Sequence, residues 1–256
     1  MKSLFALALA LCAGAAFAQD LTPTGDKSII SEDARLEVLF DGAFFTEGPA
    51  VAPDGSVYFS DITMSEPSGM QAGHIWRYDP ETGETAVYRS PSGMSNGLKF
   101  DAQGRLIAAE GADFGGRRVT RTDLNTGKAE IIAGLYEGRP FNAPNDISID
   151  EKGRIYFSDP RYIGHEPIYQ PVQGVYRIDP DGSIHRIIAD AGKPNGVCVS
   201  PDQQSIYVVS NGGRYIGFDS VVEAHFISMG ALALLAYDLR ADGTATFLEV
   251  LVDYAP

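Results

Sequence analysis

Residues 54–61 have the sequence DGSVYFSD, a tight turn followed by a short strand, and this stretch decides the fold. The same register recurs as QGRLI at residues 103–107, KGRIYFSD at 152–159 and QQSIYVV at 203–209. The turn glycines of the first three copies are 49 residues apart, and Gln204 takes the equivalent place 51 residues later. This regular period predicts one structural unit of roughly 50 residues, repeated four times.

Each copy brings four expected strands. Apolar strands precede the turns, at residues 50–52, 98–100, 147–149 and 197–199. Third strands follow at residues 75–79, 119–123, 175–179 and 235–238, and further glycine turns lead to fourth strands such as 85–88 and 247–252. Four short antiparallel strands per repeat are typical of a β-propeller blade, which buries both of its faces only by stacking on neighbouring blades.

We therefore predict an all-β chain with a β-propeller domain at residues 36–256, of a type that commonly has six blades. About four complete blades are expected, and residues 36–40 are expected to form a closing strand after a lead-in at 19–35. Because Pro256 directly follows a fourth strand, we expect the propeller to be truncated at its C-terminal end. A genuine four-bladed ring is the alternative.

The first 18 residues have the pattern of a secretory signal peptide. Lys2 precedes an apolar run that ends in AFA at residues 16–18, with small residues where a signal peptidase cuts. We expect cleavage after this point and a periplasmic or secreted product. Lipid attachment at Cys12 is disfavoured, because that signal needs a small residue before the cysteine and Leu11 stands there.

The composition limits the partners. The chain carries 20 Lys and Arg residues against 34 Asp and Glu residues, which gives a formal net charge of -14. Such an acidic protein lacks the basic face that a nucleic-acid backbone requires. The apolar run at residues 226–236 is too short to span a bilayer. We expect a small-molecule substrate, no nucleic acid and no membrane span, and the oligomeric state stays open.

The repeat also locates a polar set of side chains. Glu47, Asn96 and Asn145 stand eight positions before the first three turn glycines. Asn195 stands nine positions before Gln204. Because the innermost strands of a propeller line its central channel, side chains at one repeat phase should meet at one mouth of that channel.

This polar set consists of one carboxylate and several amide oxygens, which suits a hard divalent cation, most of all Ca²⁺. Zinc is disfavoured, since the cysteines and histidines show no paired ligand spacing. The alternative interpretation is that Asn-Gly and Asn-Asp pairs simply form turns at the entries of the blades. Four polar residues in one phase favour the cation.

The sequence around this polar set resembles the family of gluconolactonases and the senescence marker protein regucalcin. Paraoxonase and diisopropyl fluorophosphatase are more distant relatives. The similarity extends over residues 36–256. The segments that carry it are TEGP at residues 46–49, SNGL at 95–98, APNDI at 143–147 and KPNGV at 193–197.

The resemblance implies a six-bladed propeller with one catalytic divalent ion at its axis. By this resemblance Glu47, Asn145 and Asn195 are metal ligands, and Asn96 lines the pocket. The family uses a further Asp as ligand and base, and the chain ends at Pro256, one residue before the position where the resemblance places it. A truncated, catalytically impaired family member is therefore one alternative.

The expected activity is that of a lactonase, which opens sugar lactones such as glucono-1,5-lactone to the aldonic acid. The metal ion would polarise the lactone carbonyl while a carboxylate accepts a proton from the attacking water. Asp146, beside an expected ligand, is the candidate for this carboxylate. The candidates for substrate binding are Asn96, Asp159, Arg161, Tyr162 and His165.

Two other classes of function are considered. GMSNG at residues 93–97 fits the Gly-x-Ser-x-Gly motif of serine hydrolases, but a strand is expected where that motif requires a helix. A non-catalytic periplasmic propeller that binds or scaffolds other molecules is the second alternative, because the repeat alone supports it equally. The in-phase set of Glu47, Asn145 and Asn195 favours the enzyme.

Overall fold

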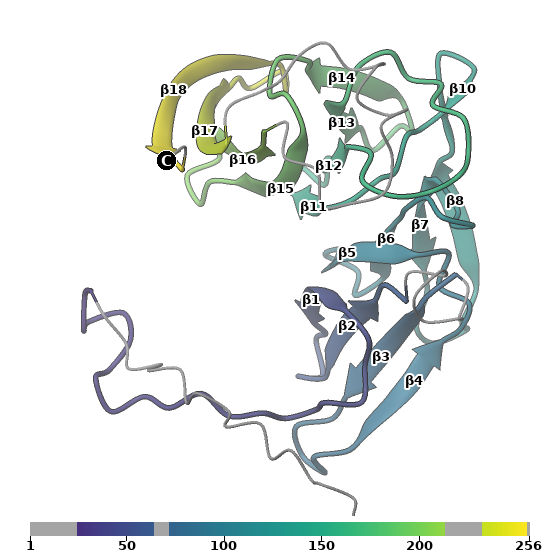
Figure 1. Cartoon of the computed structure of the whole chain (residues 1–256), viewed down its shortest axis with the longest axis vertical. Helices are drawn as coiled ribbons and strands as arrows, with labels where there is room; N and C mark the ends of the chain where they lie inside the picture. Colours follow the sequence, from purple (N-terminus) through teal and green to yellow (C-terminus); the bar gives the residue numbers. More distant parts are fainter. Residues whose placement is uncertain (1–24, 64–71, 213–231, 255–256) are drawn as a thin grey trace, which may run out of the picture. The chain divides into compact units, whose positions relative to one another are not determined.

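The computed structural model describes residues 25–63, 72–212 and 232–254, and it divides the chain into two compact units, Met1–Asp41 and Gly42–Pro256 (Figure 1). The expected signal peptide lies outside the described residues.

The closing strand predicted at residues 36–40 does not form, and this prediction is wrong. A strand requires a neighbour that pairs with its backbone groups, and the described part of the chain provides no ladder partner for this segment.

The second unit contains, in its described residues, four sheets of four strands each and no helix. The first sheet contains β1 (Thr46–Val51), β2 (Val57–Asp61), β3 (His74–Tyr78) and β4 (Thr85–Arg89). The second contains β5 (Ser95–Phe100), β6 (Leu106–Glu110), β7 (Arg118–Thr122) and β8 (Ala129–Ala133). The third contains β11 (Ile147–Ile149), β12 (Ile155–Asp159), β13 (Gly174–Ile178) and β14 (Ile184–Ile188). The fourth contains β15 (Pro194–Val199), β16 (Ser205–Asn211), β17 (Leu232–Leu239) and β18 (Ala245–Asp253).

Within each sheet the strands follow chain order and pair antiparallel, as the repeat predicts. The short hairpin of β9 (Leu135–Tyr136) and β10 (Arg139–Pro140) between the second and third sheets is an addition that the repeat does not predict. Each repeat of the sequence therefore forms one four-stranded sheet of the structure.

The turn before the second strand corrects the sequence alignment in the fourth sheet. At Gly153 the backbone has a positive φ of 76°, and its N–H donates to the carbonyl oxygen three residues earlier at 2.9 Å. Gln203, rather than Gln204, takes this place, with a φ of 63° and the same hydrogen bond at 2.9 Å. One extra residue follows this turn before the strand resumes. Asn195 therefore stands eight residues before its turn residue, like the other members of the polar set.

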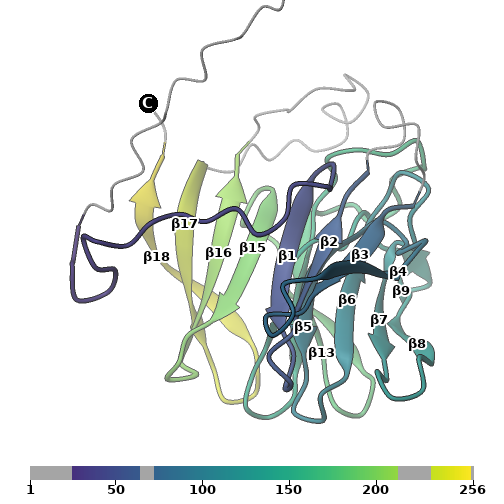
Figure 2. The same ribbon diagram turned by 90° about the horizontal axis from the view of Figure 1, so that it is seen from below.

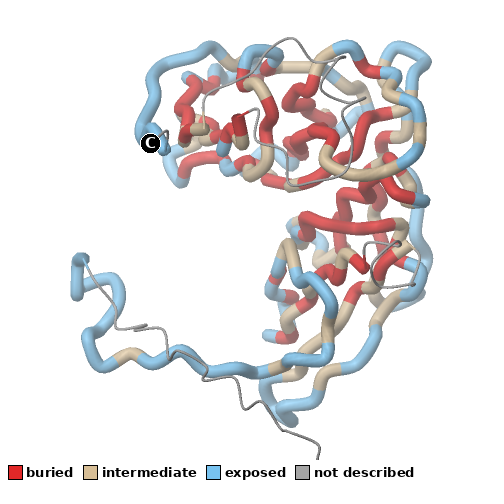
Figure 3. Tube along the Cα trace, in the orientation of Figure 1, coloured by how far each residue is buried: buried red, intermediate tan, exposed pale blue. Residues whose placement is uncertain are grey.

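Apolar side chains alternate between the two faces of the middle sheets. In β6, Leu106 and Ala108 pack toward the first sheet, whereas Ile107 and Ala109 pack toward the third. In β12, Tyr156 packs into the cluster shared with the fourth sheet. In Figure 3 the buried segments accordingly lie mainly in the inner and middle strands, and the outer strands and turns are largely exposed. Burial of both faces is what stacked propeller blades require.

The innermost strands of the four sheets are neighbours within the second unit. Contacts link β1 to β5, β5 to β11, and β11 to β15. Figure 1 shows these strands along the inner side of the sheets and β4, β8, β14 and β18 on the outer side, and Figure 2 shows the fourth sheet from the side, with β15 to β18 in chain order. The predicted all-β propeller arrangement is confirmed, and it brings corresponding ends of the innermost strands together.

Candidate active site

The innermost strands are irregular where the predicted polar residues stand. The ladder between β1 and β2 contains one extra residue after Glu47, and β5 and β15 show the same irregularity around Asn96 and Asn195. Such a bulge turns a side chain away from the regular alternation of a strand. Asn145 lies two residues before the start of β11, and its N–H donates to the carbonyl oxygen of Ser158 at 2.9 Å. All four residues thus stand at the same repeat position of their sheets.

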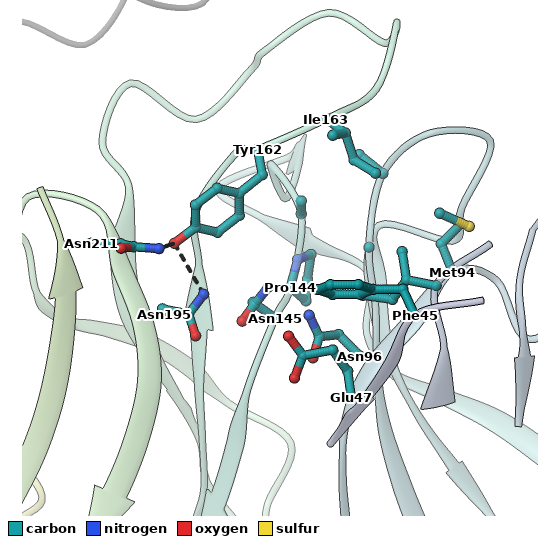
Figure 4. Close-up of a pocket in the computed structure, with 14 residues that line it drawn as sticks. Phe45, Glu47, Met94, Asn96, Pro144, Asn145, Tyr162, Ile163, Asn195 and Asn211 are labelled. Atoms are coloured by element: carbon teal, nitrogen blue, oxygen red, sulfur yellow. Dashed lines mark hydrogen bonds between the residues drawn. The ribbon is translucent and has the colours of Figure 1, made fainter. Parts of the chain in front are cut away.

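The four polar side chains meet in one cavity of about 290 Å³ (Figure 4). Its lining consists of Phe45, Glu47, Ile62, Met94, Asn96, Gly111, Ala112, Ala143, Pro144, Asn145, Tyr162, Ile163, Asn195 and Asn211. The structure thus brings together the whole polar set that the repeat phase predicts. It adds one predicted substrate-binding residue, Tyr162, and one residue that the sequence analysis missed, Asn211.

Glycines allow the innermost strands to approach each other at this point. A Cβ atom at Gly48 would overlap the carbonyl oxygen of Asn96, and one at Gly97 would lie 2.7 Å from the carbonyl oxygen of Asn145. The N–H of Gly97 donates to that same oxygen at 2.6 Å. Backbone contact of this kind between neighbouring sheets is possible only without side chains, and it lets the preceding polar residues converge.

Asp146 occupies the position that glycine holds in the other three sheets. Its Oδ2 accepts a hydrogen bond from the N–H of Val197 at 2.8 Å, and its own N–H donates to Oγ of Ser158 at 3.1 Å. Burial raises the pKa of the Asp146 carboxyl. Asp146 is not among the cavity-lining residues, and its contacts join the third sheet to the fourth. Its expected role as a base stays a prediction.

Glu47 is the carboxylate that lines the cavity. Partial burial raises the pKa of Glu47; the Gly48 N–H opposes this shift, and the charge of Asp146 adds to it. None of the ion pairs among the described residues includes Glu47. In the same part of the chain, no three His, Cys, Asp or Glu side chains cluster as metal ligands. A cation here would therefore depend on Glu47 and on amide oxygens.

Tyr162 orients two amides at the cavity. Its hydroxyl oxygen accepts hydrogen bonds from Nδ2 of Asn195 at 3.1 Å and from Nδ2 of Asn211 at 3.2 Å (Figure 4). These bonds leave Oδ1 of Asn195 available to the cavity. Burial raises the pKa of Tyr162, so the phenol stays neutral at pH 7. The ammonium of Lys193 lies 5.1 Å from the centre of the ring.

Asp159 supports the site from behind the cavity. It is fully buried and accepts hydrogen bonds from the N–H groups of Asn142 at 2.9 Å and Ala143 at 2.8 Å. Burial raises the pKa of Asp159 to about 7. Asp61 ends β2 at the same repeat position and accepts the N–H of Phe45 at 2.9 Å. Both carboxylates therefore accept backbone N–H groups of the segment that leads into an innermost strand of their own sheet.

Arg161 and His165 also lie outside the cavity lining. The Arg161 guanidinium is buried and donates to the carbonyl oxygen of Asn142 at 2.8 Å and to Oε2 of Glu166 at 3.1 Å. The His165 side chain is 74% exposed, and its Nε2 lies 3.7 Å from a carboxylate oxygen of Asp113. The structure therefore places Tyr162, but not Asp159, Arg161 or His165, against the polar set.

The arrangement can be compared with known proteins. The family model described as SMP-30/Gluconolactonase/LRE-like region matches residues 45–220, a stretch that includes the whole polar set. The chain belongs to this family. Within the SMP-30/gluconolactonase family, it is 29% identical over 205 residues to the gluconolactonase of Zymomonas mobilis, covering 73% of this chain and 54% of that protein.

A second curated relative shows the same partial coverage. Pentonolactonase XacC of Haloferax volcanii is 25% identical over 171 residues, which cover 66% of this chain and 51% of that protein. The chain spans about half the length of the curated relatives it matches.

Solved structures agree with the fold. The gluconolactonase XC5397 from Xanthomonas campestris matches with a TM-score of 0.64 and 28% identity, over 81% of this chain and 62% of that one. A luciferin-regenerating enzyme matches with a TM-score of 0.58 and 15% identity, over 83% of this chain and 62% of that one, which shows a common fold alone. No helix in the described residues has the length and hydropathy to cross a membrane.

Proposed function

We propose that the chain hydrolyses lactones at this cavity with the help of a bound divalent cation, in the first place Ca²⁺. The observation that carries the proposal is the meeting of one carboxylate, Glu47, with four Asn side chains, three of them from the predicted polar set, in one cavity of a gluconolactonase-family chain. Relatives named gluconolactonase, lactonohydrolase and pentonolactonase support the opening of a lactone ring as the reaction.

Glu47, Asn145 and Asn195 are the residues that would hold the cation, with Asn96 beside them. One carboxylate and several amide oxygens are ligands that Ca²⁺ prefers. The raised pKa of Glu47 and its lack of an ion pair in the described residues fit a cationic partner. The hydrogen bond from Nδ2 of Asn195 to Tyr162 leaves the amide oxygen for the same purpose. A bound divalent cation supplies Lewis acidity toward a carbonyl oxygen.

The chain's own side chains would position the lactone and move the proton. The amide groups of Asn96 and Asn145 and the hydroxyl of Tyr162 line the cavity as hydrogen-bond donors for the substrate oxygens. Water adds to the carbonyl carbon, and a carboxylate accepts its proton and returns it to the ring oxygen as the ring C–O bond breaks. Asp146 is the carboxylate proposed for this step, because it follows the cavity-lining Asn145 in the chain and burial raises its pKa; since Asp146 itself does not line the cavity, it would accept the proton through one intervening water.

Two further points belong to the proposal. Glucono-1,5-lactone, which the resemblance implies as substrate, is the reference compound for assays, and its product would be the aldonic acid. The signal-peptide pattern of residues 1–18 supports export, so we propose that the protein acts in the periplasm or outside the cell.

The test is lactone hydrolysis by the purified chain, followed as acid release at constant pH. Turnover that is lost on chelation and restored by Ca²⁺ is expected for the wild type and for the exposed control Glu249→Gln. In Glu47→Gln both Ca²⁺ binding and turnover should fall by at least tenfold. Cation binding without turnover of any lactone would favour the non-catalytic binding module instead.

A further inference from the structure

The cavity has two unlike sides. In Figure 4, Tyr162 lies with Asn195 and Asn211 at the left, Glu47 lies with Asn96 and Asn145 in the lower middle, and Phe45, Met94 and Ile163 lie to the right of Tyr162. Ile62 and several small residues complete the apolar lining. The polar groups that would carry out the reaction therefore adjoin an apolar wall, which we define as Phe45, Ile62, Met94 and Ile163.

The apolar wall is held in place by its own contacts. The N–H of Phe45 donates to the buried carboxylate of Asp61 at 2.9 Å, and the carbonyl oxygen of Phe45 accepts the N–H of Ile62 at 2.9 Å. Met94 is only 2% exposed. Ile163 directly follows Tyr162, so the wall and the polar side are fixed to neighbouring positions of the chain. The wall is thus a built part of the cavity.

The described lining residues offer few further partners for hydroxyl groups. Nδ2 of Asn195 and Nδ2 of Asn211 are already bonded to Tyr162. Among the described lining residues there is no Lys, Arg, His, Ser, Thr or Gln side chain. A polyhydroxylated lactone would turn some of its hydroxyl groups toward Phe45 and Ile163, where they would lose water without gaining a partner.

We infer that the cavity selects lactones that carry a hydrocarbon substituent over polyhydroxylated sugar lactones. The lactone group would face the polar side while the substituent lies against the apolar wall. This inference rests on the proposed lactone hydrolysis and names its substrate class. Burial of each methylene group should raise kcat/KM by roughly three- to fourfold until the wall is covered. Each hydroxyl group without a partner should lower it by roughly tenfold.

The experiment compares kcat/KM of the full chain, with Ca²⁺ present, for glucono-1,5-lactone and a series of δ-lactones. The series consists of δ-valerolactone and its derivatives with methyl, propyl and pentyl substituents. We expect kcat/KM to rise along the series and to exceed the value for glucono-1,5-lactone at the pentyl member. Turnover of glucono-1,5-lactone with no gain from alkyl groups would overturn the inference and leave the proposed function intact.

Variants of the wall connect this preference to the structure. Phe45→Gln and Ile163→Gln should flatten the rise with chain length, because both residues are partly exposed and polar replacements there are tolerated. The matched control is Ile131→Gln on the exposed outer strand β8, which should keep the wild-type series. An unchanged rise in the wall variants would overturn the inference.

A binding measurement covers the case in which no lactone is hydrolysed and the proposed function fails. δ-Valerolactam and its pentyl derivative serve as non-hydrolysable probes in calorimetry. Tighter binding of the pentyl compound, lost in Ile163→Gln, would still support selection by the apolar wall. Equal affinity for the two lactams would overturn it.

Discussion

Replacing Tyr162 by Phe removes the hydroxyl that orients the amides at the cavity. The hydroxyl oxygen accepts one hydrogen bond from Asn195 at 3.1 Å and one from Asn211 at 3.2 Å. At about 1 kcal/mol net for each bond, the pair stabilises this arrangement by about 2 kcal/mol. Loss of the arrangement frees the Asn195 amide to rotate, so we expect the dissociation constant for Ca²⁺ to rise by about 10- to 100-fold.

The assay for Tyr162→Phe is calorimetric titration of chelator-treated protein with Ca²⁺, without substrate. Tyr169→Phe is the matched control, because Tyr169 is 46% exposed, lies over Arg117 and does not line the cavity. The control should bind Ca²⁺ like the wild type, and both variants should keep their melting temperature within a few degrees. An unchanged dissociation constant in Tyr162→Phe would refute the reasoning that the hydroxyl orients a ligand.

Three further predictions concern the residues around the cavity. Gly97→Ala places a Cβ 2.7 Å from the carbonyl oxygen of Asn145 and should lower the free energy of unfolding by about 1–3 kcal/mol. The control is Gly134→Ala, whose Cβ would meet only the Ile131 side chain at an ordinary contact distance of 3.4 Å and should leave the melting temperature nearly unchanged. Asp146→Asn should lower kcat by about 100-fold or more with intact folding if the carboxylate is the base, and wild-type kcat would leave it a purely structural residue. The pKa of Asp159 is raised to about 7 in the folded state, so the folded wild type binds a proton at this carboxyl more tightly than the unfolded chain does. Raising the pH from 4 to 7 should therefore lower the stability of the wild type relative to Asp159→Asn. A melting temperature that changes with pH in the same way in both proteins would contradict this.

The repeat spacing is sufficient to predict the sheets and the polar set, because turn and strand chemistry are local and the propeller gives each repeat phase one place in space. The one-residue error at Gln203 arises because the fourth turn has no glycine to mark its left-handed position. The wrong prediction of a strand at 36–40 has a different cause. Its pattern fits a strand, but strand formation depends on a partner that the local sequence does not specify.

The side-chain contacts between neighbouring blades could not be predicted from the sequence. Tyr162 meets Asn211 across 49 residues, and Asp146 meets the N–H of Val197 across 51 residues. One signal for Asn211 exists in the repeat, since it ends β16 as Asp159 ends β12. Whether such a residue turns into the cavity or toward a backbone loop depends on side-chain packing between sheets, which the repeat phase does not encode.

The central claim is that Glu47, Asn145 and Asn195 hold a cation on which lactone hydrolysis depends. The most direct test is one Ca²⁺ titration of chelator-treated chain in which heat of binding and lactone hydrolysis are measured on the same preparation. We expect both to saturate at the same Ca²⁺ concentration and both to shift together in Glu47→Gln. Hydrolysis that proceeds at full rate before any Ca²⁺ is added, or binding that is undiminished in Glu47→Gln, would contradict the claim.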